Sequence, residues 1–307
     1  MLANRIYYQI KPFIPRSLQI LLRRRIVLRK RRLNGHIWPI DQSAGTPPEG
    51  WTGWPEEKKF ALILMHDVDT EKGHRKCYDL MRLEEEMGFR SSFNFVPEGY
   101  NVSPELRSHL VQRGFEVGVH GLRHEGRLLL TRKSFSNQAI RINHYLKEWQ
   151  SNGFVSPSML CRLDWIHDIA VKYDTSTFDT DPFEPQPAAV RTIFPFWVKN
   201  SSHAKGFIEI PYTLPQDFTL YVLMKERTID LWIKKLDWIA QNGGMALVIT
   251  HPDYMTFSGK RPAIDEYPVE YYKEFLEYIK SRYEGQCWHV LPTHLAVFWM
   301  NFLGKFS

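Results

Sequence analysis

The chain has 307 residues, of which 43% are hydrophobic and 14% aromatic, enough to bury a sizeable core as one large domain or two small ones. Its three cysteines are far apart and odd in number, which argues against a disulfide framework or a zinc site built from cysteine pairs and favours a cytoplasmic location. The net charge of +6 is uneven, because residues 1–33 carry ten Lys and Arg and no acid, leaving 30 basic and 34 acidic residues elsewhere.

The basic segment, residues 1–33, mixes Leu, Ile and Val with Arg and Lys. Its apolar runs are far shorter than the roughly 18 residues that span a bilayer, and it lacks the cleavage site of a secretory signal. We expect an amphipathic segment held peripherally at the inner membrane face, where each basic residue contributes about 1 kcal/mol. A solvated basic arm and a nucleic-acid patch are the alternatives. Tyr7, Tyr8 and Phe13 favour the membrane, and no nucleic-acid partner is expected.

A connecting segment is expected at residues 34–58, which are rich in Gly, Pro and Trp and wrap the body, followed by one barrel domain over 59–307. In that domain apolar runs alternate with helical patterns, which predicts a parallel sheet or barrel. Strands are predicted at 60–65, 91–96, 115–120, 153–157, 206–213, 244–251 and 287–292. Helices are predicted at 74–88, 103–114, 134–150, 163–173, 227–244, 268–283 and 293–306. Residues 175–206 read as a long Pro-rich loop.

Chemically useful side chains follow several of these predicted strands. Asp67 and Asp69 come after the first strand, His120 and His124 after the third, and His251 ends a late one. Reactive groups gather at the carboxyl ends of parallel strands, because the loops there meet on one face. Two His separated by three residues plus one carboxylate suit zinc or another first-row metal, and a second carboxylate could act as a base.

Each piece also has a purely structural explanation. An Asp at a strand end is often a helix cap, and a His pair four residues apart is common in a chain with 12 His. His66 is as well explained as a residue that orients its neighbours, and His251 before Pro as part of a turn. The agreement of separate segments, all at the same ends of strands, favours a functional site.

The order of these motifs resembles that of the NodB-type polysaccharide deacetylases, carbohydrate esterase family four. The likeness covers about residues 60–300 and includes Asp-x-Asp, His-x-x-x-His, a Ser-Pro segment, "YDTSTFD" and a late strand ending in His-Pro. It implies a distorted (β/α)7 barrel, one divalent metal ion, expected to be zinc, and removal of acetyl groups from a carbohydrate substrate. It further implies Asp67 as catalytic base, Asp69, His120 and His124 as metal ligands, and His251 as general acid.

The chain departs from the family pattern at two positions. Val155 stands where the family commonly has an Arg that contacts the catalytic carboxylate, and Gly121 stands in place of a Ser or Thr. Arg162 could supply the missing cation or be an ordinary surface residue. Further residues are expected to bind substrate, contact the oxyanion or support the site: His66, Ser156, Pro157, Arg162, Asp174, Asp179 and Tyr254.

These observations predict a metal-dependent hydrolase that removes an N-acetyl group from a sugar of a surface polysaccharide or a lipid-linked glycan precursor. Two alternatives remain at this point. One is a catalytically weakened barrel that binds a glycan or a partner, which Val155 suggests. The other is a hydrolase of a different non-peptide C–N bond, which uses the same metal chemistry.

Overall fold

The computed structural model describes residues 15–124, 128–186, 189–200, 206–257, 259 and 261–305. Its main sheet runs in the order β11-β1-β2-β3-β4-β5-β7-β6, and β8 pairs with β1. All of these pairings are parallel except the one between β6 and β7. The strands are β1 (Phe60–Val68), β2 (Ser92–Phe95), β3 (Glu116–His120), β4 (Gly153–Val155), β5 (Tyr173–Asp174), β6 (Phe196–Lys199), β7 (Gly206–Glu209), β8 (Met245–Thr250) and β11 (Cys287–His289).

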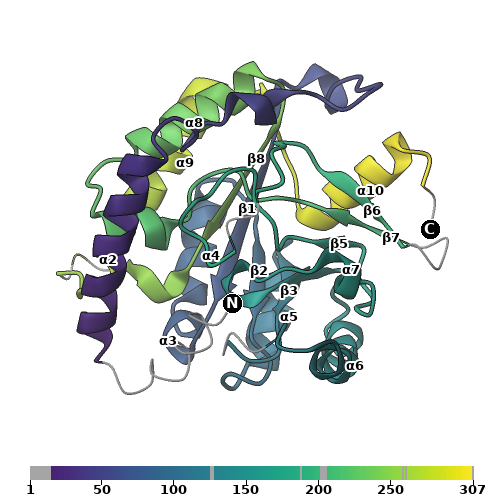
Figure 1. The fold of residues 1–307 in the computed structure, drawn as a ribbon, viewed down its shortest axis with the longest axis horizontal. Coiled ribbons are helices and arrows are strands. Elements are labelled where there is room, and N and C mark those ends of the chain that lie inside the picture. The colour runs from purple at the N-terminus through teal and green to yellow at the C-terminus, as the bar shows by residue number, and fades with distance from the viewer. Residues whose placement is uncertain are drawn as a thin grey trace.

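The sheet curls into a distorted (β/α)7 barrel, as the sequence predicts (Figure 1). Strand β1 pairs with β2, β8 and β11 in its wall. Every residue of β1 is buried, which fits a strand covered on both faces. The segment after β7 hydrogen-bonds to β8 and so joins the two ends of the sheet. The backbone N–H groups of Thr213 and Leu214 both donate to the carbonyl of Leu247, at 3.1 and 3.0 Å. The barrel therefore closes through a short irregular stretch.

Helices connect the strands and start with the caps that the sequence provides. The Ser103 side chain accepts a hydrogen bond from the N–H of Leu106, and Thr131 does the same for Ser134. The helices after β1 are α3 (Glu71–His74), α4 (Cys77–Glu86), α5 (Pro104–Gln112), α6 (Arg132–Glu148), α7 (Leu163–Ile166), α8 (Asp230–Gln241), α9 (Glu270–Tyr283) and α10 (Pro292–Phe302). A separate small sheet pairs β9 (Met255–Thr256) with β10 (Tyr267–Pro268).

Several elements differ from the sequence prediction, including the small sheet of β9 and β10, which was not predicted. The predicted helix over 163–173 is wrong beyond α7, because Tyr173 begins β5 and pairs with Gly153 and Ile208. The predicted loop over 175–206 contains β6. A buried π-helix, η5 (Phe218–Met224), lies where no element was predicted.

The basic segment contains a helix, α2 (Arg16–Leu33), that packs against η5 along the outer edge of the molecule (Figure 1). Ile20 and Val27 are buried in this contact, and the Arg24 side chain donates to the carbonyls of Val222 and Ile264, both at 3.0 Å. Tyr7, Tyr8 and Phe13 lie outside the described residues. No helix in the described ranges combines the length and the apolar character needed to cross a bilayer.

Aromatic side chains from the connecting segment fill the end of the barrel where β1, β8 and β11 begin. Trp51 and Trp54 pack together at 4.6 Å between ring centroids and contact Trp299 of α10 at 4.8 and 5.7 Å. Trp54 Nε1 also donates to the carbonyl of Gly243, which precedes β8. The tryptophan packing leaves the opposite end of the barrel for the loops that follow the strands.

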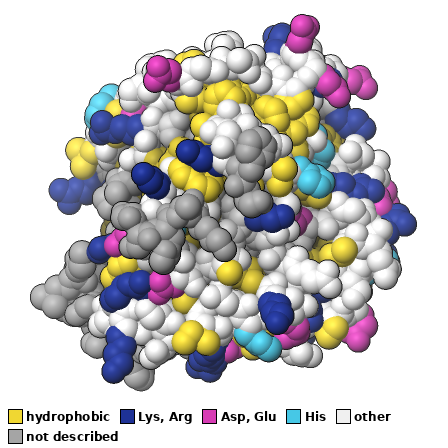
Figure 2. All heavy atoms as spheres, turned by 90° about the vertical axis from the view of Figure 1, so that its right-hand side faces the viewer, with side chains coloured by type: hydrophobic (Ala, Val, Ile, Leu, Met, Phe, Trp, Pro, Cys, Tyr) yellow, Lys and Arg dark blue, Asp and Glu magenta, His cyan; other side chains and the backbone are white. Residues whose placement is uncertain are grey.

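On the side of the molecule that carries α10, hydrophobic side chains gather in the upper half of Figure 2, and Val297 of α10 is 38% exposed.

Candidate metal centre

Three potential metal ligands meet at the carboxyl ends of the strands. Asp69 follows β1, His120 ends β3 and His124 lies in the loop after it. Nε2 of His120 and Nε2 of His124 each lie 3.4 Å from Oδ1 of Asp69. One ligand atom from each of the three residues lies within 4.8 Å of the others. The predicted ligand set is therefore brought together.

The geometry of these three residues suits a divalent ion such as zinc. Ligands about 2.0–2.1 Å from a tetrahedral zinc stand roughly 3.3 Å from one another, close to the observed 3.4 Å separations. Oδ1 of Asp69 is buried, and its neighbours among the described residues are the two imidazoles that would share the ion with it. Nδ1 of His120 lies 3.1 Å from the carbonyl of Val155 and can donate to it, which leaves Nε2 as the ligating nitrogen.

Asp67, the candidate base, is oriented by an asparagine rather than an arginine. The Asn94 amide donates to Oδ1 of Asp67 at 2.9 Å, and the two residues are register partners on β2 and β1. Gly118 makes room for this amide, because a Cβ at that position would lie 2.0 Å from Oδ1 of Asn94. Asn94 thus contacts the carboxylate that the family Arg would contact.

His251, the candidate acid, is held by the carboxylate of Asp217. Nδ1 of His251 lies 2.7 Å from Oδ1 of Asp217, whose Oδ2 accepts from the His251 backbone N–H at 2.8 Å and from the Tyr267 hydroxyl at 2.9 Å. Burial lowers the pKa of His251, but Asp217, with further help from the carboxylates of Asp69 and Asp67, raises it to about 10. The imidazole is therefore protonated at neutral pH.

The loop that carries Asp69 is fixed from the segment after β8. Oδ2 of Asp253 accepts from the backbone N–H of Asp69 at 3.0 Å, and its Oδ1 accepts from the Thr70 hydroxyl. The Tyr254 hydroxyl donates to Oδ2 of Asp69 at 3.3 Å. Burial raises the pKa of Asp69, but the nearby imidazoles of His124, His120 and His251 hold it well below its usual value.

Gly121 has a structural reason to replace the family hydroxyl residue. Its φ is +64°, and a Cβ there would lie 2.4 Å from Cγ of Pro157. Pro157 begins a short turn in which Ser158 and Met159 adopt positive φ angles of 57° and 48°. Ser156, Ser158 and Met159 line the cleft beside the ligands, so this segment is within the site, as the sequence suggests.

Four residues singled out in the sequence lie elsewhere. Arg162 pairs with Asp164 at 3.3 Å, stacks on Trp165 and does not line the cleft. The remaining three have buried partners of their own: His66 contacts Thr250 and Glu84, Asp174 accepts from Ser176 beside Glu209, and Asp179 pairs with Lys235.

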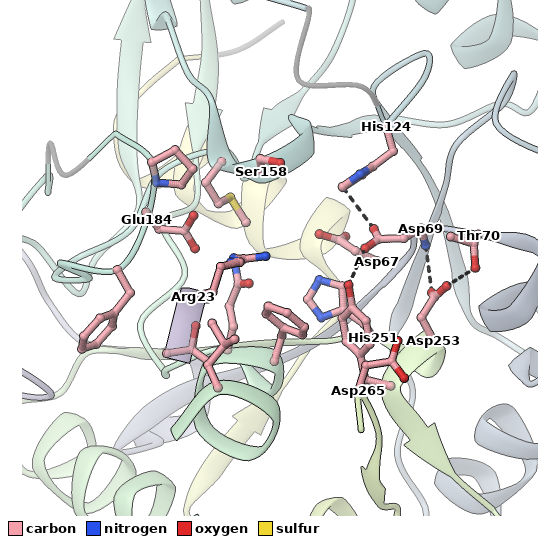
Figure 3. A pocket seen from close by; sticks show the side chains of 18 of the residues that line it. Arg23, Asp67, Asp69, Thr70, His124, Ser158, Glu184, His251, Asp253 and Asp265 are labelled. Carbon is pink, nitrogen blue, oxygen red and sulfur yellow. Dashed lines mark hydrogen bonds and ion pairs between the residues drawn. The ribbon is translucent and has the colours of Figure 1, made fainter. Parts of the chain in front are cut away.

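The candidate site opens into a cleft of about 780 Å³ (Figure 3). Its lining includes the three candidate ligands with Asp67, His251 and Tyr254. It also includes Arg23, Val27 and Lys30 of α2. The basic segment thus forms part of the cleft, which the sequence analysis did not foresee.

Sequence reasoning also missed Asn94, Asp217 and Asp253. Asn94 leaves a signal, since it is a lone amide within the buried strand "SFNF". Asp253 follows the His-Pro pair directly. Asp217 lies in no recognisable motif, and only the fold brings it to His251.

No protein-family model and no curated protein sequence matches this chain. Several solved structures, in contrast, superpose on it. A Mycobacterium smegmatis protein described as a polysaccharide deacetylase superposes with a TM-score of 0.64 at 16% identity, covering 82% of this chain and 94% of that one. A Pseudomonas aeruginosa PAO1 protein with the same description gives 0.64 at 15% identity, covering 83% and 95%. The Puue allantoinase gives 0.65 at 15% identity, covering 88% and 99%. The chain therefore has the NodB-type polysaccharide deacetylase fold.

Proposed function

We propose that this protein is a metal-dependent hydrolase that removes an N-acetyl group from a sugar of a surface polysaccharide or a lipid-linked glycan precursor. The observation that carries the proposal is the meeting of Asp69, His120 and His124 beside Asp67 in one cleft, with His251 in the same lining. A binding module would need neither a base nor an acid at such a centre.

The side chains divide the chemistry as follows. Asp69, His120 and His124 would hold a divalent ion, which when bound would make a water molecule more acidic and polarise the acyl carbonyl. Asp67 takes the proton from the attacking water, and Asn94 keeps its carboxylate aimed at that position. His251, protonated through Asp217, gives its Nε2 proton to the leaving nitrogen so that the sugar departs as an amine.

Acetate release tests this proposal. The zinc-loaded protein is incubated with N-acetylated oligosaccharides, and acetate and the free amine are quantified. Asp67→Asn should abolish turnover and keep bound zinc, since Asp67 is not among the three ligands. Failure to release acetate from any N-acetylated glycan would overturn the proposal.

A second candidate is hydrolysis of another non-peptide C–N bond. The similarity to an allantoinase over 99% of that chain supports keeping it. The same base, acid and ligands would serve a cyclic amide, because the leaving group is again a nitrogen that needs a proton. Assaying cyclic amides and N-acetylated sugars side by side separates the two candidate functions. A deacetylase should turn over only the N-acetylated sugars, and a cyclic amide hydrolase only the cyclic amides.

The membrane contact that we propose involves the outer face of α2. From residue 18 onward every exposed residue of this helix is Leu, Ile or Arg. They are Leu18, Leu21, Leu22, Arg25, Ile26, Leu28, Arg29, Arg32 and Leu33. Such a face suits the surface of an anionic bilayer, where aliphatic side chains enter the interface and arginines contact phosphates.

Vesicle sedimentation tests the membrane contact. The protein should bind phosphatidylcholine vesicles that contain phosphatidylglycerol, more weakly at high salt, and Leu22→Glu should reduce binding. Ile140→Glu is the matched control, because Ile140 is 70% exposed but lies on α6. Absence of binding to anionic vesicles at low salt would contradict the membrane proposal and leave the catalytic one intact.

A further inference from the structure

Helix α2 presents a row of cations to the cleft. Arg16, Arg23 and Lys30 all line it, and their spacing of seven residues places them on one face of the helix. Apart from Ile26, which also lines the cleft, the Leu, Ile and Arg residues of the face described above do not line it. Helix α2 therefore contributes positive charge to the same cleft that contains the candidate metal centre.

The three cations differ in what they contact. Nε of Arg16 lies 3.5 Å from Asp265, and Nζ of Lys30 donates to the Pro182 carbonyl at 2.7 Å. The guanidinium of Arg23 lies 4.7 Å from the centroid of the Phe218 ring and has no carboxylate within 4.0 Å in the described parts of the chain. Within the described ranges its N–H groups donate no hydrogen bond to the protein, and Figure 3 shows the side chain reaching into the cleft between Glu184 and His251.

Two adjacent aromatic rings, tilted relative to each other, connect Arg23 to the candidate metal centre. Phe218, beneath the guanidinium, packs on Tyr254 at 4.6 Å between ring centroids, and Tyr254 packs on His251 at 5.2 Å. Tyr254 also donates to Asp69. A group bound at Arg23 is thus held at a fixed offset from the reacting position, along a surface on which a sugar ring can pack.

The acid nearest to this part of the cleft does not cancel the charge of Arg23. Glu184 also lines the cleft. Its burial and the neighbouring Asp181 raise its pKa to about 8, against the opposing effect of the Tyr212 hydroxyl and Arg23. The raised pKa favours the uncharged form of Glu184 and so weakens its competition for Arg23.

We propose that Arg23 binds an anionic group, a phosphate or a carboxylate, carried by the acylated sugar, so that the preferred substrate is a negatively charged glycan. This inference rests on the proposed deacetylase function. An arginine matches such groups because its planar fork donates two parallel hydrogen bonds to phosphate or carboxylate oxygens. Arg23 is then a residue that determines specificity and does not touch the reacting atoms.

A matched substrate series tests the proposal on the zinc-loaded full chain. The substrates are one N-acetylated sugar as its neutral methyl glycoside, as a sugar phosphate and as a sugar carboxylate. We expect kcat/KM at least tenfold higher for one anionic form than for the neutral form, with high salt reducing the difference. Comparing kcat/KM for the sugar phosphate and the sugar carboxylate identifies which anionic group Arg23 binds.

Substitutions of Arg23 test whether this residue causes the preference for anionic substrates. Arg23→Gln should bring the ratio of anionic to neutral kcat/KM close to one, and Arg23→Lys should keep part of it, since it keeps the charge and loses the fork. Arg82→Gln removes an exposed arginine on α4 and should leave the ratio unchanged. Equal kcat/KM for neutral and anionic forms in the wild type, or an unchanged ratio in Arg23→Gln, would overturn the inference.

A binding measurement separates this inference from the proposed function. Calorimetry of the same sugar phosphate and sugar carboxylate with wild type and Arg23→Gln needs no turnover. Binding to the wild type that Arg23→Gln weakens at least tenfold supports the anion site even if no acetate is ever released. Turnover without selective anion binding supports the deacetylase and rejects the anion site.

Discussion

The carboxylate of Asp217 holds His251 by both of its oxygens, Oδ1 at 2.7 Å from the ring Nδ1 and Oδ2 at 2.8 Å from the backbone nitrogen. This contact fixes the ring orientation and the proton on Nδ1. It also leaves Nε2 as the ring nitrogen that can serve a substrate. Asp217 is thus a positioning residue for the proposed acid.

Asp217→Asn should therefore change the pH profile of the reaction. The pKa of His251 is raised to about 10 in the folded protein, so the acid is charged at neutral pH and is lost as the pH rises through that value. Without the Asp217 charge the alkaline limb of kcat/KM should move to lower pH. At pH 7 the rate should fall by less than the roughly 10²- to 10⁴-fold that a positioned acid contributes. Asp79→Asn, at an exposed acid on α4, is the control; an unmoved limb in Asp217→Asn would contradict the role.

Zinc should stabilise the folded protein through Asp69, His120 and His124. A ligand that binds only the folded state adds about 2.7 kcal/mol to the free energy of unfolding when present at 100 times its Kd. Chelation should lower Tm, added zinc should restore it, and His120→Ala should abolish both effects. His144→Ala, at an exposed histidine of α6, should behave as wild type. A wild-type Tm that no divalent ion changes would count against the site.

Gly118→Ala should disturb Asp67 without touching a proposed ligand. The added Cβ would lie 2.0 Å from Oδ1 of Asn94, which forces the amide away from Asp67. We expect kcat/KM to fall about 10- to 100-fold, the usual range for residues that support a metal centre, with zinc content unchanged. Asn94→Ala should have a similar effect, and the double variant should be no worse than either single one. Gly35→Ala, which meets only a backbone oxygen at 3.7 Å, is the control.

Much of the barrel could be predicted because its strands are short apolar runs that end at chemically distinctive residues. "FALILM" predicts β1, and Asp67 and Asp69 follow at the point where the chain emerges. The same reasoning locates His120 at the end of β3 and His251 after β8. Local patterns suffice where one segment supplies both the strand and the side chain.

Residues that act through distant partners could not be predicted in this way. Asp217 and His251 are 34 positions apart, and Asn94 is 27 positions from Asp67. Within α2, Leu22 is exposed whereas its neighbour Arg23 lines the cleft, and only packing against η5 decides which face points inward. The helix predicted through Tyr173 was wrong because pairing with β4 and β7 overrides the local preference.

Asp179 and Lys235 should prove structural rather than catalytic. Both are fully buried and paired with each other. Lys235→Met should lower the free energy of unfolding by about 3–5 kcal/mol, because removing one partner leaves an uncompensated buried charge. The double variant Asp179→Asn/Lys235→Met should recover much of that loss. Urea unfolding measures both, and a loss of kcat in a variant that remains folded would instead place the pair in the mechanism.

Asp174 and Glu209 should make stability fall as the pH rises. Oδ2 of Asp174 and Oε2 of Glu209 are buried and have no hydrogen-bond partner among the described residues. Each carboxyl group shifts the pKa of the other, and we expect the two to share a proton. Burial and the charge of Asp174 raise the pKa of Glu209 well above its usual value. The folded state thus keeps a proton that the unfolded chain releases above about pH 4.3.

Each such proton lowers the free energy of unfolding by up to about 1.4 kcal/mol per pH unit between the unfolded and folded pKa values. Glu209→Gln replaces the shared proton by an amide that donates at every pH, while its oxygen can still accept from the N–H of Thr177, now at 2.9 Å. Urea unfolding at a series of pH values above about 4.3, the unfolded-state pKa of a glutamate, should show a shallower decline for Glu209→Gln than for wild type. Glu284→Gln, at an exposed position after α9, should follow wild type. If Glu209→Gln loses stability with the same slope, the two carboxyl groups do not share a proton and the buried pair must be satisfied in another way.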